Sequence, residues 1–366
     1  MNSRERVLRA FGRIKGLPDR VPIQFDLCRQ LSDHFGKEMG IPVHYTDNLY
    51  EDVTYRISAN ELRTAMGSDV VITGASIADD YKIVKNEKGI WKNEYQMGMR
   101  QGSIYVEVIE YPLAHAETKS DIDNFRFPDP NAPGRYRDAE NLVKKYHDSY
   151  LVFGDIEVTI FSLAQQLVGM EKLLVDMMME AEYVIPLFEA CTEFQTKAGL
   201  NLIDKGVDAI WAGDDFGTQN SLIMAPETFR SQLKPLYEHM NNTFKAAKKD
   251  IIPILHCDGA VSELLADISE MGYEVFNPVQ PGVPGHLPQD LKDRFGNIFS
   301  FWGAIDQQDL MPKASDAEFE KDIIEKISIL GKNGGYMISP AHIIQNDVSP
   351  ERVKLFIGLC KKHGKY

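Results

Sequence analysis

A short apolar stretch of the chain ends in side chains that can do chemistry. Residues 251–255 are all apolar, and they are followed by His256, Cys257, Asp258 and Gly259. An apolar run of this length next to a turn signal predicts a buried strand. Because side chains alternate along a strand, His256 and Asp258 should share one face and Cys257 should point the other way. Such an imidazole and carboxylate can bind one metal ion, or can form a hydrogen-bonded pair without metal.

Polar side chains also follow most of the other predicted strands. Each of them, taken singly, is explained as a helix cap or a turn former. Their recurrence at one end of many strands instead indicates a shared mouth, because parallel strands keep their chemistry at their carboxyl ends. The strand-end residues are Asp26, Asp155, Glu157, Asp214 with Asp215, Gln280, Asp306 and His342.

These positions lead to specific expectations about roles. We expect His256, Asp258, His342 and Asp306 to be catalytic. The expected metal ligands are His256, Asp258 and His342 with Glu157 as a fourth candidate, and nitrogen and oxygen ligands of this kind suit zinc with an open coordination position. The residues expected to bind substrate are Asp26, Asp155, Glu157, Asp214, Gln280 and Trp302.

Eight strand–helix units are predicted to position these groups. Such alternation indicates a parallel sheet, and eight units indicate a (β/α)8 TIM barrel. An open doubly wound sheet is the alternative, but no GxGxxG motif follows an early strand. The predicted strands are residues 21–26, 68–74, 151–157, 207–215, 251–259, 274–280, 298–306 and 335–344. The predicted helices include residues 4–15, 138–146, 170–205 with a break at Pro186, 226–249, 261–271, 287–295, 316–330 and a last helix from Pro350.

The first part of the chain departs from this regular alternation. A mostly helical region follows the first strand, and residues 81–110 alternate apolar and polar side chains in the manner of exposed antiparallel strands. We predict strands at residues 81–84, 89–92 and 103–110, which form a β-hairpin insertion. No linker or repeat divides the sequence, so residues 1–366 are predicted to form one domain.

Composition limits the classes of partner. The 366 residues carry a formal charge of −14, which disfavours nucleic acid and anionic membranes. The four cysteines lie far apart and make neither a disulfide framework nor a cysteine-rich zinc site. We expect no signal peptide and no membrane span, and therefore a cytoplasmic protein.

Several stretches together resemble the uroporphyrinogen decarboxylase superfamily. They are residues 254–259 (ILHCDG), 270–280, 301–306 (FWGAID), 334–342 with its SPAH end, 68–71 (SDVV) and 111–113 (YPL). The resemblance spans most of the chain and is strongest after residue 150. It implies a (β/α)8 barrel, often a homodimer, and either of two chemistries: porphyrinogen decarboxylation, or methyl transfer to or from corrinoids.

Two departures from the family patterns bear on that choice. The decarboxylases carry an Arg-Gln-Ala-Gly-Arg stretch after the first strand, whose arginines hold the carboxylates of the substrate. Only Arg29 and Gln30 remain of it here, and an acidic mouth is wrong for a polyanion. The thiol-methylating branch holds zinc with a His-x-Cys pair and a later Cys. Here Asp258 stands at the first of those cysteine positions and His342 about where the second would be, which makes a harder, more Lewis-acidic site.

The resemblance therefore implies a corrinoid-dependent methyltransferase. It would take a methyl group from a small donor, with a methoxylated aromatic as first candidate. Corrinoid-carrying domains of such systems display an Asp-x-His-x-x-Gly motif, which this sequence lacks, so the corrinoid should arrive on a separate protein or as free cobalamin. Two alternatives stay open: a uroporphyrinogen decarboxylase that places Asp26 or Asp69 near the pyrrole N–H groups, and a non-catalytic barrel that binds a tetrapyrrole or a partner protein.

Overall fold

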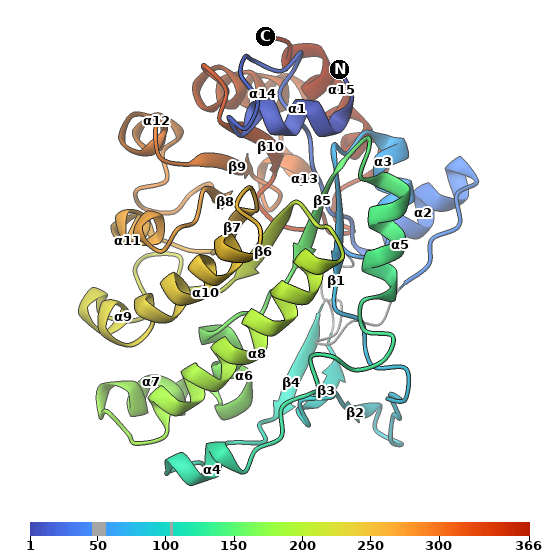
Figure 1. Ribbon diagram of the computed structural model, residues 1–366. Helices are drawn as coiled ribbons and strands as arrows, with labels where there is room; N and C mark the ends of the chain where they lie inside the picture. Colours follow the sequence, from blue (N-terminus) through green and yellow to red (C-terminus); the bar gives the residue numbers. More distant parts are fainter. Residues whose placement is uncertain (46–55, 103–104) are drawn as a thin grey trace.

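In the described part of the chain, the main sheet has seven parallel strands. The computed structural model describes residues 1–45, 56–102 and 105–366. In spatial order the strands are β1 (Val70–Gly74), β5 (Leu151–Asp155), β6 (Ala209–Gly213), β7 (Ile252–His256), β8 (Val275–Val279), β9 (Ser300–Ile305) and β10 (Tyr336–Pro340). The sheet curls, and its helices lie on the outer side (Figure 1). The prediction of six consecutive parallel strands within residues 151–344 is confirmed.

The first predicted strand, residues 21–26, does not form as a regular strand. Ile23 and Leu27 make only isolated parallel bridges, to Ile338 and Ile344 on the β10 side. On the β1 side, the backbone N–H of Asp69 donates to the carbonyl of Ile23 over 2.8 Å. Pro22 lacks an N–H group, which interrupts regular pairing here. The regular strands consequently make a curled parallel α/β sheet that is not closed, rather than the expected eight-stranded ring.

Two separate cores lie on the two faces of this sheet. The inner core consists of inward-facing strand residues, among them Ile72, Phe153, Trp211, Ile254 and Trp302. At the amino ends of the strands it is closed by Val7, Ala10 and Phe11, which belong to or follow helix α1 (Ser3–Ala10). The outer core packs the opposite strand faces against the helices. Because apolar residues fill the inner core and close its amino end, its open end lies at the carboxyl ends of the strands.

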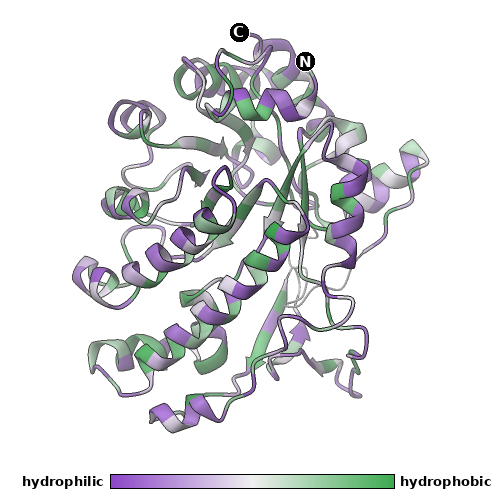
Figure 2. Ribbon diagram, viewed as in Figure 1, coloured by the Kyte–Doolittle hydropathy of each residue, from purple (hydrophilic) through white to green (hydrophobic). Residues whose placement is uncertain are grey.

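The helices follow the predicted alternation, with differences at their ends. The expected helix over residues 170–205 is broken before Pro186, which lies in the first turn of α8, where a missing N–H costs nothing. Figure 2 shows mostly hydrophobic strands and helices of mixed polarity. The helices are α2 (Arg29–Met39), α3 (Asn60–Met66), α4 (Lys119–Asp123), α5 (Arg137–Tyr146), α6 (Phe161–Val168), α7 (Met170–Met178), α8 (Val184–Asp204), α9 (Pro226–Gln232), α10 (Lys234–Ala247), η1 (Ser262–Leu264), α11 (Leu265–Glu270), α12 (Pro288–Phe295), α13 (Leu310–Lys313), α14 (Asp316–Leu330) and α15 (Pro350–His363).

The predicted antiparallel insertion forms a small sheet of its own. It pairs β2 (Ile90–Lys92), β3 (Gly98–Gln101) and β4 (Val106–Glu110) in that order, and it lies beyond the lower ends of β1 and β5 in Figure 1. The prediction of a strand over residues 81–84 was wrong, and β3 was not predicted. Residues 103 and 104 of the last predicted strand lie outside the described residues. No helix in the described ranges has both the length and the apolar character needed to cross a membrane.

Candidate active site at the carboxyl ends of the strands

Three of the residues expected to be catalytic meet in space. His256 is the last residue of β7, Asp258 follows two positions later, and His342 follows β10. Each offers one possible ligand atom, and these atoms all lie within 4.8 Å of one another. The strand alternation predicted the first two to be together, and the curl of the sheet adds the third.

The ring of His256 is held from its far side. Its Nδ1 lies 2.7 Å from Oδ1 of Asn277 on the neighbouring strand β8. Its Nε2 faces two carboxylates, at 3.7 Å from Oε1 of Glu157 and 3.7 Å from Oδ2 of Asp258. With Nδ1 committed to the amide oxygen as donor, Nε2 is the atom left for chemistry or for a ligand.

Electrostatics in this group favour the charged forms of His256 and Asp258 and the neutral form of His342. Burial lowers the pKa of His256, but the carboxylates of Glu157 and Asp258 outweigh it and raise that pKa to about 10. For Asp258, burial opposes the charged form, yet the nearby His256 keeps its pKa below the ordinary value. For His342, burial dominates and lowers the pKa, which favours the neutral ring. A metal requires neutral imidazoles and a carboxylate, so His342 and Asp258 are already in the required state, whereas His256 would lose its Nε2 proton when the ion binds.

Glu157 is shared between this group and an arginine that the sequence did not predict to be functional. Nη1 of Arg56 pairs with Oε2 of Glu157, and its guanidinium lies 4.2 Å above the ring of Trp211. Arg56 precedes α3, in a stretch without strand periodicity, so no local signal placed it at the strand ends. Gly213 makes room for Glu157, because a Cβ at this glycine would lie 2.2 Å from Cγ of Glu157. Glu157 accordingly has less freedom to bind a metal than the three clustered residues.

Two more of the expected acids lie close to arginines. Asp155 is 3.7 Å from Nη1 of Arg56. Burial raises the pKa of Asp155 to about 7, with Arg56 acting against the shift and Glu157 adding to it. Asp26 pairs with Arg63 at the inner side of the site. Arg56 and Arg63 therefore form ion pairs with carboxylates of this chain.

The turn after β7 is shaped by a glycine and an amide. Gly259 has a φ of +88°, and a Cβ there would lie 2.5 Å from the backbone of Gly217, so a larger residue is excluded. Its N–H donates to Oε1 of Gln280 over 2.7 Å. The N–H of Asp258 donates to Oδ1 of Asp215 over 2.8 Å. Gln280, expected to bind substrate, thus supports the loop that carries Asp258.

Two expected site residues are not brought into this group. Asp214 is 1% exposed and accepts hydrogen bonds from the N–H groups of Ile160 and Ser162 and from the hydroxyl of Tyr237. Asp306 accepts from the N–H groups of Gln308 and Asp309, as a turn former does, and is absent from the described residues that line the cavity below. The strand pattern could not indicate where a side chain points once its strand has ended.

A cavity of about 20 Å³ lies beside His256 and His342. Trp302, expected to bind substrate, lines it together with Trp211, and the two indole rings are 4.4 Å apart. Trp302 is only 1% exposed, so it forms the floor of the site rather than a surface on which a ring could stack. The residues that line the cavity are Gln24, Asp26, Arg56, Trp211, His256, Asn277, Trp302, Ser339, Pro340, Ala341, His342 and Ile343.

The antiparallel insertion also reaches the site. The ring of Tyr105, which precedes β4, lies 6.1 Å from the ring of His342 in an edge-to-face arrangement. Its hydroxyl accepts a hydrogen bond from Nε2 of Gln345 over 3.0 Å. Burial raises the pKa of Tyr105, so the phenol stays neutral. The insertion thus contributes a side chain to the rim of the mouth.

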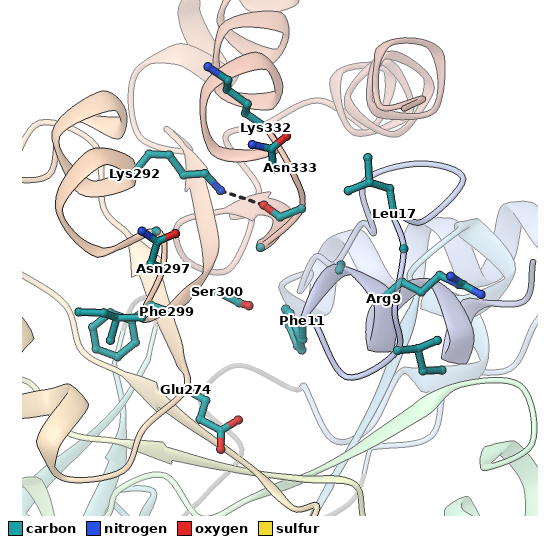
Figure 3. Close-up of a pocket in the computed structure, with 18 of the residues that line it drawn as sticks. Arg9, Phe11, Leu17, Glu274, Lys292, Asn297, Phe299, Ser300, Lys332 and Asn333 are labelled. Atoms are coloured by element: carbon teal, nitrogen blue, oxygen red, sulfur yellow. Dashed lines mark hydrogen bonds between the residues drawn. The ribbon is translucent and has the colours of Figure 1, made fainter.

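A larger groove, of about 860 Å³, opens at the other end of the strands (Figure 3). It lies between the turn after α1, which carries Phe11 and Leu17, and the loops that precede β9 and β10. Lys292 points into this region and donates to the carbonyls of Leu330 and Gly334. The acid–imidazole group is at the opposite end, so cavity size does not mark the chemistry here.

Comparison with protein families shows the family to which the chain belongs. The model of the family described as uroporphyrinogen decarboxylase (URO-D) matches residues 96–363, which is well over half of the sequence. The chain belongs to the uroporphyrinogen decarboxylase family. No curated protein matches it in a sequence search.

Solved structures are similar to this family member in fold. A methyltransferase from Methanosarcina mazei aligns with a TM-score of 0.68 at 15% identity, over 99% of each chain. An α-amylase from Lactobacillus plantarum gives a TM-score of 0.41 at 12% identity, over 90% of this chain and 70% of its own, which is too low to support an argument. At such identities the likeness concerns the fold alone.

The clustered residues of this URO-D family member suit a metal ion. A metal-bound histidine ordinarily donates its second ring N–H to an oxygen, and Asn277 supplies that oxygen to His256. Asp258 would provide a carboxylate and His342 a second imidazole. Cys257 lies in the outer core, as predicted, and Sγ accepts the N–H of Phe216 over 3.4 Å. The donor set is therefore two nitrogens and an oxygen, which zinc accepts.

Proposed function

We propose that this protein is a methyltransferase that moves a methyl group from a small methylated donor to a corrinoid carried by a separate protein. A methoxylated aromatic is the first candidate donor. The observation that carries the proposal is the convergence of His256, Asp258 and His342 within 4.8 Å at the carboxyl ends of the strands. The fold shared with a protein named as a methyltransferase supports it.

The chemistry requires a group that stabilises the leaving oxygen. The bond from oxygen to the methyl carbon breaks, the acceptor supplies the electron pair for the new bond, and the oxygen keeps its pair and takes a proton. Zinc held by His256, Asp258 and His342 would act as a Lewis acid toward that oxygen. If the site works without metal, His256 is the proton donor, since its pKa near 10 keeps Nε2 protonated at neutral pH.

The acceptor must come to the mouth from outside. The sequence has no Asp-x-His-x-x-Gly motif that would hold a corrinoid. Methyl transfer needs the donor carbon and the nucleophile in near-attack contact. The partner should therefore dock over the strand ends, close to Tyr105 and the insertion that carries it.

Porphyrinogen decarboxylation is the second candidate, and the family name favours it. A substrate with many carboxylates needs cations that are free to bind them. Arg56, which lines the cavity, is already paired with Glu157, and Arg63 is paired with the lining residue Asp26. Asp69, one of the two acids considered for the pyrrole groups, lies at the amino end of β1 and pairs with Arg6 and Arg20, so its position speaks against that role.

A methylation assay separates these candidates. The protein is mixed with reduced cobalamin, or with a candidate corrinoid protein, and with methoxyarenes, thioethers or methylamines. The absorption spectrum then reports methylation of the acceptor. We expect methylation with an oxygen-linked donor, and a loss of at least about 100-fold in Asp258→Ala and His342→Ala. His239→Ala, at an exposed histidine of α10, is the matched control.

Three outcomes would contradict parts of the proposal. Decarboxylation of a porphyrinogen by the same preparation, without any methyl transfer, would establish the second candidate. Methyl transfer retained in full by both variants would discard the residue assignments. Binding of a tetrapyrrole without either reaction would indicate the non-catalytic barrel.

The assembly and the metal belong to the same proposal. We infer a homodimer, as the family resemblance implies, with one zinc ion in each subunit at His256, Asp258 and His342, and a cytoplasmic location. Light scattering measures the mass, and metal analysis of protein purified without chelator measures the zinc. Stoichiometric zinc that persists in His256→Ala and His342→Ala would place the ligands elsewhere.

A further inference from the structure

Three buried N–H donors without an acceptor belong to residues that line the cavity beside His256 and His342. They are Nε2 of Gln24 and the indole Nε1 atoms of Trp211 and Trp302, and none has a hydrogen-bond partner in the described part of the chain. These residues are 3%, 2% and 1% exposed. Gln24 comes from the extended segment before α2, Trp211 from β6 and Trp302 from β9, so three distant parts of the sequence converge here.

A buried N–H donor without a hydrogen-bond partner destabilises the folded state, and few such donors remain in native proteins. Other buried polar atoms of the described residues also lack partners, but these three donors belong to residues that line one cavity. The cavity of about 20 Å³ has room for one oxygen atom, since a single water needs about 10–15 Å³. A hydrogen-bond acceptor bound in this cavity would therefore satisfy donors that are otherwise unpaired.

The charges around the cavity decide what kind of acceptor fits. Asp26 lines the cavity, and Glu157 and Asp258 lie close to His256. The guanidinium groups of Arg56 and Arg63 are already neutralised by Glu157 and Asp26. An incoming anion would meet these carboxylates, and the nearby cations Arg56 and His256 already face them, whereas an uncharged oxygen needs only N–H donors.

We propose that this cavity is the inner end of the substrate site, and that N–H donors among those of Gln24, Trp211 and Trp302 bind an uncharged oxygen atom of the substrate, in a carbonyl, hydroxyl or ether group. The inference rests on the proposed function for the statement that this ligand is the methyl donor. It narrows the donor to oxygenated molecules, because a simple methylamine or thioether offers the three donors no oxygen.

Two small probes of the same shape test this directly. Formamide carries an uncharged carbonyl oxygen, and formate carries the corresponding anion. In protein labelled with ¹⁵N-tryptophan, the three tryptophans give three indole signals, and Trp91 on β2 is the internal reference because it does not line the cavity. We expect formamide to shift the Trp211 and Trp302 signals saturably, with Trp91 unchanged and formate much weaker.

A variant of Gln24 tests the contribution of its amide to binding. Gln24→Leu should weaken formamide binding several-fold, and Gln101→Leu, at an exposed glutamine of β3, should not. Formate binding tighter than formamide would overturn the uncharged class. Indole signals that respond to neither probe and show only contact with water would mean a structural water, and would overturn the subsite. Failure of methyl transfer with intact formamide binding would remove the proposed function alone.

Discussion

Nδ1 of His256 lies 2.7 Å from Oδ1 of Asn277, and the two residues are direct partners in the register of β7 and β8. Parallel pairing thus places an oxygen acceptor behind the imidazole that the site depends on. The contact leaves Nε2 directed at Glu157 and Asp258. A ring fixed in this way does not have to be ordered when a ligand arrives.

We therefore predict that Asn277→Ala weakens zinc binding by about 10- to 100-fold, because the ring loses the acceptor that orients it. Competition with a chromogenic chelator measures the affinity. Asn241→Ala is the control, since Asn241 is equally buried but donates to the carbonyl of Met271 away from the site. Equal zinc affinity in the two variants would show that Asn277 plays no part in holding the ring.

Gly213→Ala should destabilise the protein by about 1–3 kcal/mol, through overpacking against Glu157. The added Cβ would lie 2.2 Å from Cγ of that side chain. Urea denaturation measures the free energy of unfolding. In a Glu157→Ala background the same substitution should cost much less, and additive effects would contradict the contact. Gly358→Ala in α15, where nothing lies within 4 Å, is the matched control.

A buried histidine that is not one of the three clustered residues predicts acid sensitivity. His286 is 3% exposed, and burial lowers its pKa from 6.5 to about 4. The unfolded chain binds the proton between these values and the folded chain does not, so stability is complete above pH 6.5 and falls as the pH drops toward 4. The loss should reach about 3 kcal/mol.

His286→Phe tests this expectation, because a phenyl ring can occupy the position beside Phe276 without taking up a proton. Denaturation curves between pH 7 and pH 4 should show a shallower decline in His286→Phe than in the unaltered protein. The exposed His239→Phe serves as the comparison. A decline that is identical in all three proteins would assign the acid sensitivity to other groups.

Cys257 should be inert despite its position between two site residues. All four cysteines are buried, and burial raises the pKa of Cys257 well above its ordinary value. A thiol reagent should react with the native protein slowly and with the unfolded protein fully. Cys257→Ala should keep its zinc, whereas His256→Ala should lose it. Zinc loss in Cys257→Ala alone would show that the thiol is a ligand.

Local periodicity was enough to predict part of this site. In β7 the alternation of side chains put His256 and Asp258 on one face and Cys257 on the other, and the structure has them so. The same signal predicted six neighbouring parallel strands from residue 151 onward. A period of two residues is a property of the extended backbone itself, so it can be read without knowledge of the fold.

Other parts of the site depend on contacts between distant segments. Arg56 pairs with Glu157 across 101 positions of sequence, and nothing near Arg56 in the chain indicates that partner. Asp214 and Asp306 follow strands as Glu157 does, yet they turn to backbone N–H groups, because strand alternation ends with the strand.

The sequence by itself determined the six parallel strands from residue 151 onward and the faces of the residues in β7, since both follow from local hydrophobic pattern and backbone geometry. Only the tertiary structure decided which strand-end groups meet. The curl of the sheet brings His342 to His256 and Trp302 to Trp211, with ring centres 6.0 Å and 4.4 Å apart. That curl sums the twist of all its strands, and so no single segment of sequence specifies it.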